Sequence, residues 1–159
     1  MEPTQQMLCF SLYAASRATT KVYSTLLEPH GLTYPQYLVL VLLWSRDARS
    51  VRDLGDALDL DSGTLSPLLR RMEQAGLVER SRRGADERVV HIALTDRGRA
   101  LRAELADVPR CVADGMRVDR ASGADLIASL ANLADGMRET AAELRDDASR
   151  ASHPQKENA

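Results

Sequence analysis

The stretch from Asp61 to Gly76 restricts the fold of this chain more than any other. Its apolar residues recur at steps of three and four, the spacing of one buried helical face. Gly76 suits the left-handed position that ends a helix, while Pro67 lacks the amide that a helix interior donates. We therefore predict a short amphipathic helix that begins near Gly63 or bends at Pro67. Its apolar face comprises Leu65, Leu68, Leu69 and Met72, and its polar face comprises Thr64, Ser66, Arg70 and Arg71.

By itself this pattern also fits a core helix with a solvated basic edge, and the flanking sequence decides between the two. Upstream, Ser50 and Asp53 have the spacing of a capping box, which predicts a second short helix and hence a helix-turn-helix. Downstream, residues 77–83 and 88–94 are rich in β-branched and apolar residues around a turn, which predicts a two-stranded hairpin. Such a hairpin is a wing, and basic side chains gather near its tip: Arg82, Arg83 and Arg88.

Long helices are predicted on both sides of this region. Residues 5–28 carry apolar residues at alternating steps of four and three, a narrow seam suited to another helix. Thr95 is expected to cap a helix that Pro109 bends or breaks, and Ser122 with Asp125 is expected to open a last helix with a similar seam. The prediction is a single, mainly α domain with a small β-hairpin wing: dimerisation helices in 5–33 and 95–148, a winged helix-turn-helix in 34–94 and a loose tail in 149–159.

Composition excludes several classes of protein. An apolar content of 44% is ample for a core, and a net charge of −2 argues against a surface coated in positive charge. No apolar run approaches the length of a membrane span and no signal core follows the N-terminus, which predicts a cytoplasmic protein. The two cysteines, Cys9 and Cys111, lack metal-ligand spacing, and no glycine loop for phosphates occurs, so we expect no metal and no cofactor.

These motifs together resemble the MarR family of transcription regulators, in which a winged helix-turn-helix is combined with terminal dimerisation helices. The segment Asp86-Glu-Arg88 resembles that family's wing motif. Residues 8–13, 32–38 and 60–69 are similar more specifically to its OhrR branch, which senses organic hydroperoxides. The resemblance runs from about Leu8 to Leu101, and the arginine-rich linker expected at 110–120 departs from it.

The resemblance implies a repressor, not an enzyme, that binds a pseudo-palindromic operator in double-stranded DNA as a homodimer. It implies that an organic hydroperoxide oxidises Cys9, that Tyr23 and Tyr34 hydrogen-bond the sensing sulfur, and that Cys111 closes an intersubunit disulfide. Tyr23 follows Cys9 by 14 positions, about 21 Å along a continuous helix, so it can serve Cys9 only across a dimer. The DNA contacts expected are those of Thr64, Ser66, Arg70, Arg71, Arg83, Asp86 and Arg88.

The chemistry of a thiol sensor supports the same residues. A cysteine with an ordinary pKa of about 8.5 is only a few per cent thiolate at neutral pH, so a sensor must stabilise its anion. Hydrogen bonds from two phenols, worth about 1.5 to 3 kcal/mol each, would do so. The other interpretation is a buried small cysteine with tyrosines as core filler. Two other functions remain open: a regulator that binds a small aromatic ligand in the dimer cleft, and a thiol peroxidase, which the absence of a Cys-x-x-Cys pair disfavours.

Overall fold

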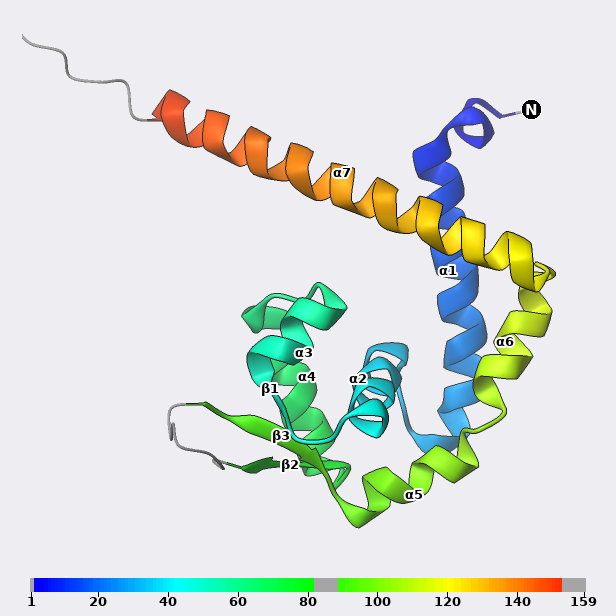
Figure 1. Cartoon of the computed structure of the whole chain (residues 1–159), viewed down its shortest axis with the longest axis vertical. Helices are drawn as coiled ribbons and strands as arrows, with labels where there is room; N and C mark the ends of the chain where they lie inside the picture. The colour runs from blue at the N-terminus through cyan, green and yellow to red at the C-terminus, as the bar shows by residue number, and fades with distance from the viewer. Residues whose placement is uncertain (1, 82–88, 153–159) are drawn as a thin grey trace, which may run out of the picture. The chain divides into compact units, whose positions relative to one another are not determined.

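The computed structural model describes residues 2–81 and 89–152, which form helices and one small sheet (Figure 1). The chain divides between Gly115 and Met116 into two compact units. In chain order the elements are η1 (Pro3–Gln6), α1 (Leu8–Leu27), η2 (Glu28–His30), α2 (Tyr34–Ser45), β1 (Arg49–Ser50), α3 (Val51–Leu58), α4 (Ser62–Gln74), β2 (Val78–Ser81), β3 (His91–Leu94), α5 (Asp96–Glu104), α6 (Val108–Met116) and, in the second unit, α7 (Arg120–Ser152).

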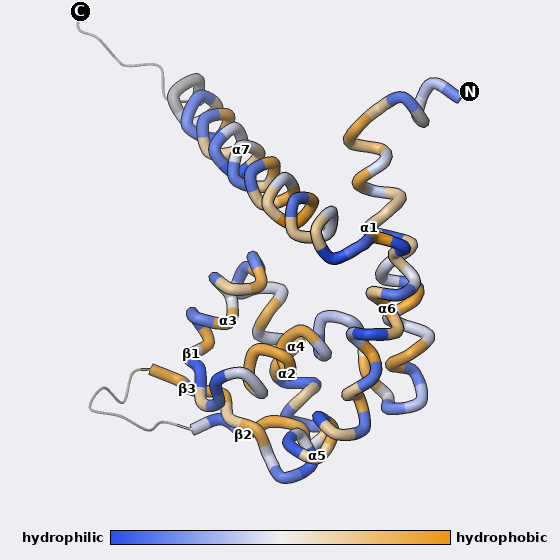
Figure 2. The backbone as a smooth tube through the Cα atoms, turned by 45° about the vertical axis from the view of Figure 1, so that its right-hand side comes forward, coloured by the Kyte–Doolittle hydropathy of each residue, from blue (hydrophilic) through white to orange (hydrophobic). Residues whose placement is uncertain are grey.

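The core of the first unit is centred on α2 and α4, which pack against each other (Figure 2). Helix α2 is apolar on almost all sides, and Val39, Leu40 and Leu43 are buried. The four residues predicted to form the apolar face of α4 are all buried, and its hydroxyl and arginine side chains are exposed. The orientation predicted for this helix from its periodicity is therefore confirmed.

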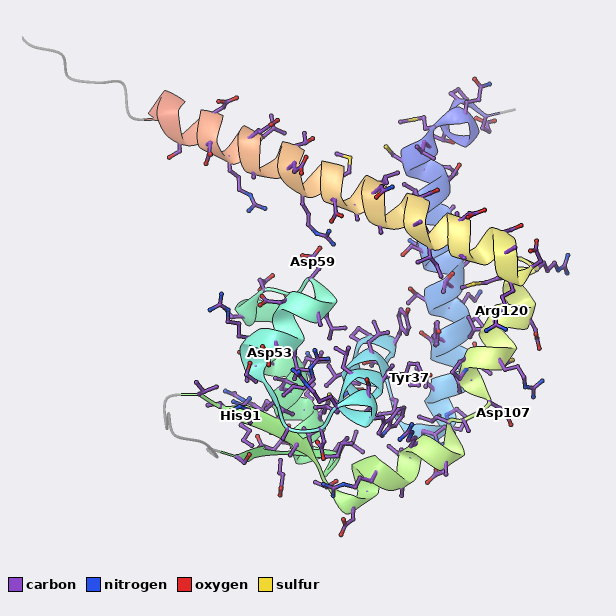
Figure 3. The ribbon with its side chains drawn as sticks, in the orientation of Figure 1. Tyr37, Asp53, Asp59, His91, Asp107 and Arg120 are labelled. Carbon is purple, nitrogen blue, oxygen red and sulfur yellow. The ribbon has the colours of Figure 1, made fainter. Side chains whose placement is uncertain are left out.

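Helices α3 and α4 form the predicted helix-turn-helix. Ser50 caps α3, since its hydroxyl accepts a hydrogen bond of 3.0 Å from the amide of Asp53. Asp59 ends the helix with a φ of 54°, in the left-handed region that aspartate tolerates better than most residues. Asp53 and Asp59 mark the two ends of α3 in Figure 3.

Helix α4 begins one residue before the expected Gly63 and continues through Pro67. Its N-cap is Asp61, whose carboxylate accepts from the amide of Thr64 at 2.9 Å. That amide, followed by the Thr64 hydroxyl, holds the pKa of Asp61 below its ordinary value, so the cap is ionised at neutral pH. Gly76 follows the helix with a φ of 68°, as predicted.

The predicted hairpin is part of a three-stranded antiparallel sheet in the order β1-β3-β2. Its strands β2 and β3 are shorter than the predicted 77–83 and 88–94, and Val78 lies opposite Leu94. The added strand, β1, pairs Ser50 with His91. Four residues of the predicted wing lie outside the described residues, so their roles stay predictions: Arg82, Arg83, Asp86 and Arg88.

The connection from the sheet to Cys111 contains the predicted cap and break. Thr95 caps α5, accepting a hydrogen bond of 3.1 Å from the amide of Gly98. The helical path breaks between α5 and α6, and Pro109 lies in the first turn of α6, where its missing amide costs little. The segment expected as a linker at 110–120 is helical through Met116, so Cys111 lies on α6.

Helix α7 starts earlier and ends later than expected. The prediction that Ser122 caps this helix is wrong. The cap is Asp119, whose carboxylate accepts from the amides of Ala121 and Ser122 at 3.0 and 3.1 Å. The helix also continues through residue 152, into the predicted tail at 149–159. None of the described helices is both long and apolar enough to cross a bilayer. The apolar side chains exposed along α7 are Leu126, Ile127, Leu130, Met137 and Leu144.

Candidate functional site

The predicted sensing residue, Cys9, lies in the first turn of α1 with its free side chain exposed. Amides in the first turn of a helix have no helical acceptor, and together with the helix dipole they favour an anion there. Neighbouring apolar side chains are exposed as well: Leu8 at 65%, Phe10 at 37% and Tyr13 at 56%. The start of α1 therefore presents a thiol within an apolar surface.

Three tyrosines form what we call the tyrosine cluster, made of Tyr23 on α1 and Tyr34 and Tyr37 on α2 (Figure 3 labels Tyr37). The rings of Tyr23 and Tyr34 stack with their centroids 4.1 Å apart and their planes at 21°. The Tyr37 ring lies 5.6 Å from that of Tyr23. The fold thus brings together the two tyrosines that sequence analysis assigned to the sensor and adds a third.

The phenols of the cluster can act as hydrogen-bond donors at neutral pH. Burial, followed by the proximity of Tyr34 and Tyr37, raises the pKa of Tyr23 above 10.0, and burial followed by Tyr34 raises that of Tyr37. Both hydroxyls therefore remain protonated. Within residues 2–81 and 89–152, the hydroxyls of Tyr23 and Tyr34 have no hydrogen-bond partner, so both donors are available to another group.

The second cysteine, Cys111, is also free and exposed, on α6. The neighbouring cation, Arg110, is already paired with Asp107 at 3.1 Å and Asp114 at 3.8 Å. The two thiols therefore differ in their surroundings: Cys9 lies in the first turn of α1, and Cys111 lies beside an arginine that two aspartates already engage.

Four predicted DNA-contacting residues lie on the exposed face of α4, and only some of their side chains are already hydrogen-bonded within the chain. The Thr64 hydroxyl donates to Asp61 at 3.2 Å, and Arg71 Nε donates to the Pro67 carbonyl at 3.3 Å. Ser66 and Arg70 are exposed, and Arg70 makes no ion pair with any residue that the structure describes. Arg70 is therefore the most available cation on this helix.

Sequence analysis missed the contacts that hold the end of α4 against α5. The Thr95 hydroxyl donates to the Gly76 carbonyl at 2.6 Å, and the Thr95 amide donates to that of Leu77 at 3.2 Å. Gly98 packs directly on Leu77, because a Cβ at Gly98 would overlap the Leu77 carbonyl oxygen. The available signal was a glycine in the first turn of a helix, where propensity favours alanine.

The C-terminal end of α2 holds the same turn of α5 from another direction. Trp44 Nε1 donates to the Gly98 carbonyl at 2.9 Å. The Asp47 carboxylate accepts from the Leu94 amide at 2.8 Å and pairs with Arg99 at 3.1 Å. These interactions tie α2, β3 and α5 together. We call their main residues the junction: Trp44, Asp47, Thr95, Gly98 and Arg99.

Comparison with known proteins places this architecture. Residues 21–105 match the family described as transcriptional regulator SarA/Rot. Over 122 residues the chain is 47% identical to the organic hydroperoxide resistance transcriptional regulator of Bacillus subtilis (strain 168), covering 77% of this chain and 81% of that protein. The chain belongs to the MarR/SarA family of winged-helix transcriptional regulators. The predicted family, fold class and regulator function are confirmed, and the relatives are regulators and not enzymes.

Solved structures of AbfR, a protein of Staphylococcus epidermidis, are similar to this MarR/SarA-family chain. Reduced AbfR bound to DNA superposes with a TM-score of 0.70 at 32% identity, covering 84% of this chain and 91% of that one. The disulfide-formed AbfR gives a TM-score of 0.59 at 36% identity, covering 79% and 88%. In the part of this chain that the structure describes, no group of three or more His, Cys, Asp or Glu side chains could hold a metal ion.

Proposed function

We propose that this regulator is a homodimeric cytoplasmic repressor that senses organic hydroperoxides through Cys9 and releases its operator DNA when Cys9 is oxidised. The observation that carries the proposal is the stacked pair Tyr23 and Tyr34, whose hydroxyls lack partners within the described chain. Two such donors and an exposed thiol in a first helical turn are what a thiolate sensor requires. The name of the Bacillus subtilis relative, which refers to organic hydroperoxide resistance, supports the same assignment.

The proposed sensor is completed by a second copy of the chain. Helix α1 is continuous from Leu8 to Leu27, so Cys9 and Tyr23 of one chain are about 21 Å apart. At about 100° per residue they lie on nearly the same side of the helix. Two α1 helices packed antiparallel would therefore set Cys9 of one subunit beside Tyr23 of the other. The exposed apolar side chains of α1 and α7 supply surface for such a dimer.

The proposed chemistry uses the hydroperoxide as the only oxidant. The Cys9 thiolate attacks the terminal oxygen, the sulfur–oxygen bond forms as the oxygen–oxygen bond breaks, and the alkoxide leaves as an alcohol after taking a proton. The resulting sulfenic acid is attacked by the Cys111 thiol of the other subunit, which forms the disulfide and releases water. The break between α5 and α6 gives Cys111 a place to move from without unfolding a helix.

Operator recognition is assigned to α4 together with the wing. Arg70 and Arg71 would enter the major groove with Thr64 and Ser66, and the wing residues Arg83, Asp86 and Arg88 would act at the neighbouring minor groove. A two-fold dimer presents two copies of α4, so the operator would be a pseudo-palindrome with half-sites about one helical turn apart. A disulfide that shifts the subunits would break this spacing and release the DNA.

The first test replaces the sensing thiol. Cys9→Ser is expected to bind the operator as tightly as reduced wild type and to stay bound after cumene hydroperoxide, because a hydroxyl of similar size cannot be oxidised. Fluorescence anisotropy with labelled operator measures both states, and dithiothreitol should restore binding by oxidised wild type. Release of Cys9→Ser by peroxide at the wild-type dose would refute the sensor assignment.

A second test addresses the DNA surface. Arg70→Ala is expected to weaken operator binding by about 1 to 3 kcal/mol per subunit if the guanidinium reads a base. If it contacts a phosphate instead, the slope of log K against log salt should fall by roughly 0.9 per subunit. Affinity is measured across a salt series, with Arg102→Ala on α5 as the matched control. Equal affinity and slope for Arg70→Ala and wild type would remove Arg70 from the interface.

One observation favours a second candidate, a regulator that binds a small aromatic acid. A pocket of about 300 Å³ is lined by residues of α2, of α5 and of the start of α6, among them Tyr37, Trp44 and Arg102. An aromatic wall beside a guanidinium suits a planar carboxylate. Peroxide-insensitive wild-type protein that releases its operator in the presence of salicylate would establish this candidate.

A further inference from the structure

We propose that Trp44 and Asp47 are positioning residues that pass the state of the tyrosine cluster to the DNA-reading helix α4. The proposal rests on the redox function above, and it assigns the part of the chain that carries the signal from the sensor to the DNA. Its basis is an unbroken series of contacts from Tyr34 to Gly76, in which each step joins two different elements or two turns of one helix.

The first part of the series is aromatic. Tyr34 stacks on Tyr23 at 4.1 Å, Tyr23 lies 5.6 Å from Tyr37, and Tyr37 meets Trp44 edge-on at 6.0 Å with the ring planes at 72°. Tyr37 is only 4% exposed, and its ring contacts those of both Tyr23 and Trp44. A displacement of the sensor tyrosines would therefore reach Trp44 through direct ring contacts. The aromatic contacts thus lead from the proposed thiol site to the C-terminal end of α2.

The second part connects α2 to α5 through polar contacts with defined direction. The Trp44 indole donates to the Gly98 carbonyl at 2.9 Å, where a phenylalanine of similar shape would fill space and make no bond. Asp47 holds the adjoining residues, accepting from the Leu94 amide at 2.8 Å and pairing with Arg99 at 3.1 Å. The first turn of α5 is therefore fixed to the end of α2 by two side chains that the proposed DNA contacts and thiol chemistry do not use.

The third part connects α5 to α4 with almost no free space. Thr95 is bonded to the Gly76 and Leu77 carbonyls, and Gly98 touches the Leu77 carbonyl oxygen where no Cβ fits. The turn formed by Gly76 and Leu77 directly follows α4. A movement of the first turn of α5 must therefore carry the end of α4 with it. Because packed contacts of this kind switch between arrangements instead of stretching, a small shift at the sensor can change the placement of α4.

The test separates sensing from output. Trp44→Phe keeps the ring that Tyr37 packs against and removes the bond to Gly98. In the reduced state it is expected to bind the operator within about threefold of wild type, because Thr95 still holds α4. In allosteric proteins, an event at one site commonly changes the affinity of a second site by about 5- to 150-fold. After cumene hydroperoxide, the ratio of oxidised to reduced Kd should reach that range in wild type and stay below about threefold in Trp44→Phe, while mass spectrometry shows equal oxidation of Cys9.

A second variant covers the case in which Trp44→Phe does not bind DNA when reduced. Arg99→Gln removes the ion pair with Asp47 and should lower the same Kd ratio. The matched control is Arg97→Gln, an exposed arginine of α5 that makes no ion pair with any described residue, and it should keep the wild-type ratio. Trp44 is the only tryptophan, so its emission in wild type should also change on oxidation and stay constant in Cys9→Ser.

The outcomes distinguish this inference from the function it rests on. If wild type keeps its operator after Cys9 is oxidised, the redox function and the inference both fail. If wild type releases its operator and the folded Trp44→Phe or Arg99→Gln variants release it to the same extent, the inference alone is overturned. If wild type releases its operator and these variants keep theirs although Cys9 is oxidised, the redox function and the inference are both supported.

Discussion

Wild-type protein treated with cumene hydroperoxide is expected to run as a covalent dimer on a non-reducing gel, and Cys111→Ser is expected to run as a monomer. Both thiols are free and exposed in the reduced chain, so each is accessible to the peroxide or to the other subunit. The proposed roles differ because Cys9 would lie beside the phenol of Tyr23 of the other subunit in an antiparallel pair of α1 helices. The effect on the gel is all or none, since one sulfur–sulfur bond decides the band.

The same experiment identifies which cysteine reacts first. In Cys111→Ser, Cys9 should still form a sulfenic acid that a dimedone probe labels, whereas Cys9→Ser should give neither the label nor the dimer. Oxidised wild type that stays monomeric with a labelled Cys9 would exclude the intersubunit disulfide. The mechanism would then use one cysteine, with a small thiol or the sulfenic acid itself as the final state.

The parts of the fold that could be predicted are those encoded by neighbouring residues. The buried face of α4 follows from the spacing of four apolar residues, and the caps Ser50 and Thr95 each act on an amide three positions later. Short-range rules failed where two nearby residues could each cap a helix. At the start of α7 the cap is Asp119, whose carboxylate accepts from the amides of Ala121 and Ser122, and not the predicted Ser122. The two-residue strand β1 is too short to show any alternation.

The junction could not be predicted because its contacts join distant parts of the sequence. Trp44 and Gly98 are 54 positions apart, and Asp47 and Leu94 are 47 apart. No local pattern marks Asp47 as different from other surface aspartates until β3 and α5 are placed beside it. The tyrosine cluster lies between these extremes: two of its members were assigned through the family resemblance, whereas the ring contacts that include Tyr37 emerge only from the packing of α1 on α2.

Helix α2 takes part in both the proposed sensor and the junction. The helix supplies Tyr34 and Tyr37 to the tyrosine cluster and Trp44 to the junction, within its 12 residues. It also packs against α4, so the proposed sensor and the DNA-reading helix share one buried element. Its residues Tyr37, Val39, Leu40 and Leu43 are buried in the core, so a movement of this helix disturbs its neighbours. A rearrangement of its tyrosines can therefore reach α4 and α5, both of which pack against α2.

Gly98→Ala is expected to cause the largest loss of stability among single substitutions at the junction. The added methyl group would overlap the Leu77 carbonyl oxygen, and a backbone atom cannot turn aside as a side chain can. Overpacking typically costs about 1 to 3 kcal/mol and occasionally more, and we expect about 3 kcal/mol here. For a chain of this size that lowers the melting temperature by roughly 6 to 12 °C, measured by thermal circular dichroism.

The control is Gly136→Ala on α7, where an added Cβ meets no atom within 4 Å. Replacing glycine by alanine inside a helix stabilises it by about 0.5 to 1 kcal/mol, so this variant should melt at or slightly above the wild-type temperature. Operator binding should follow the same order, because the methyl group at Gly98 pushes α5 away from the turn that ends α4. A Gly98→Ala protein that melts within about 2 °C of wild type and binds its operator equally well would show that α5 does not press on this turn. The position of α4 would then be set by its buried face alone, through Leu65, Leu69 and Met72.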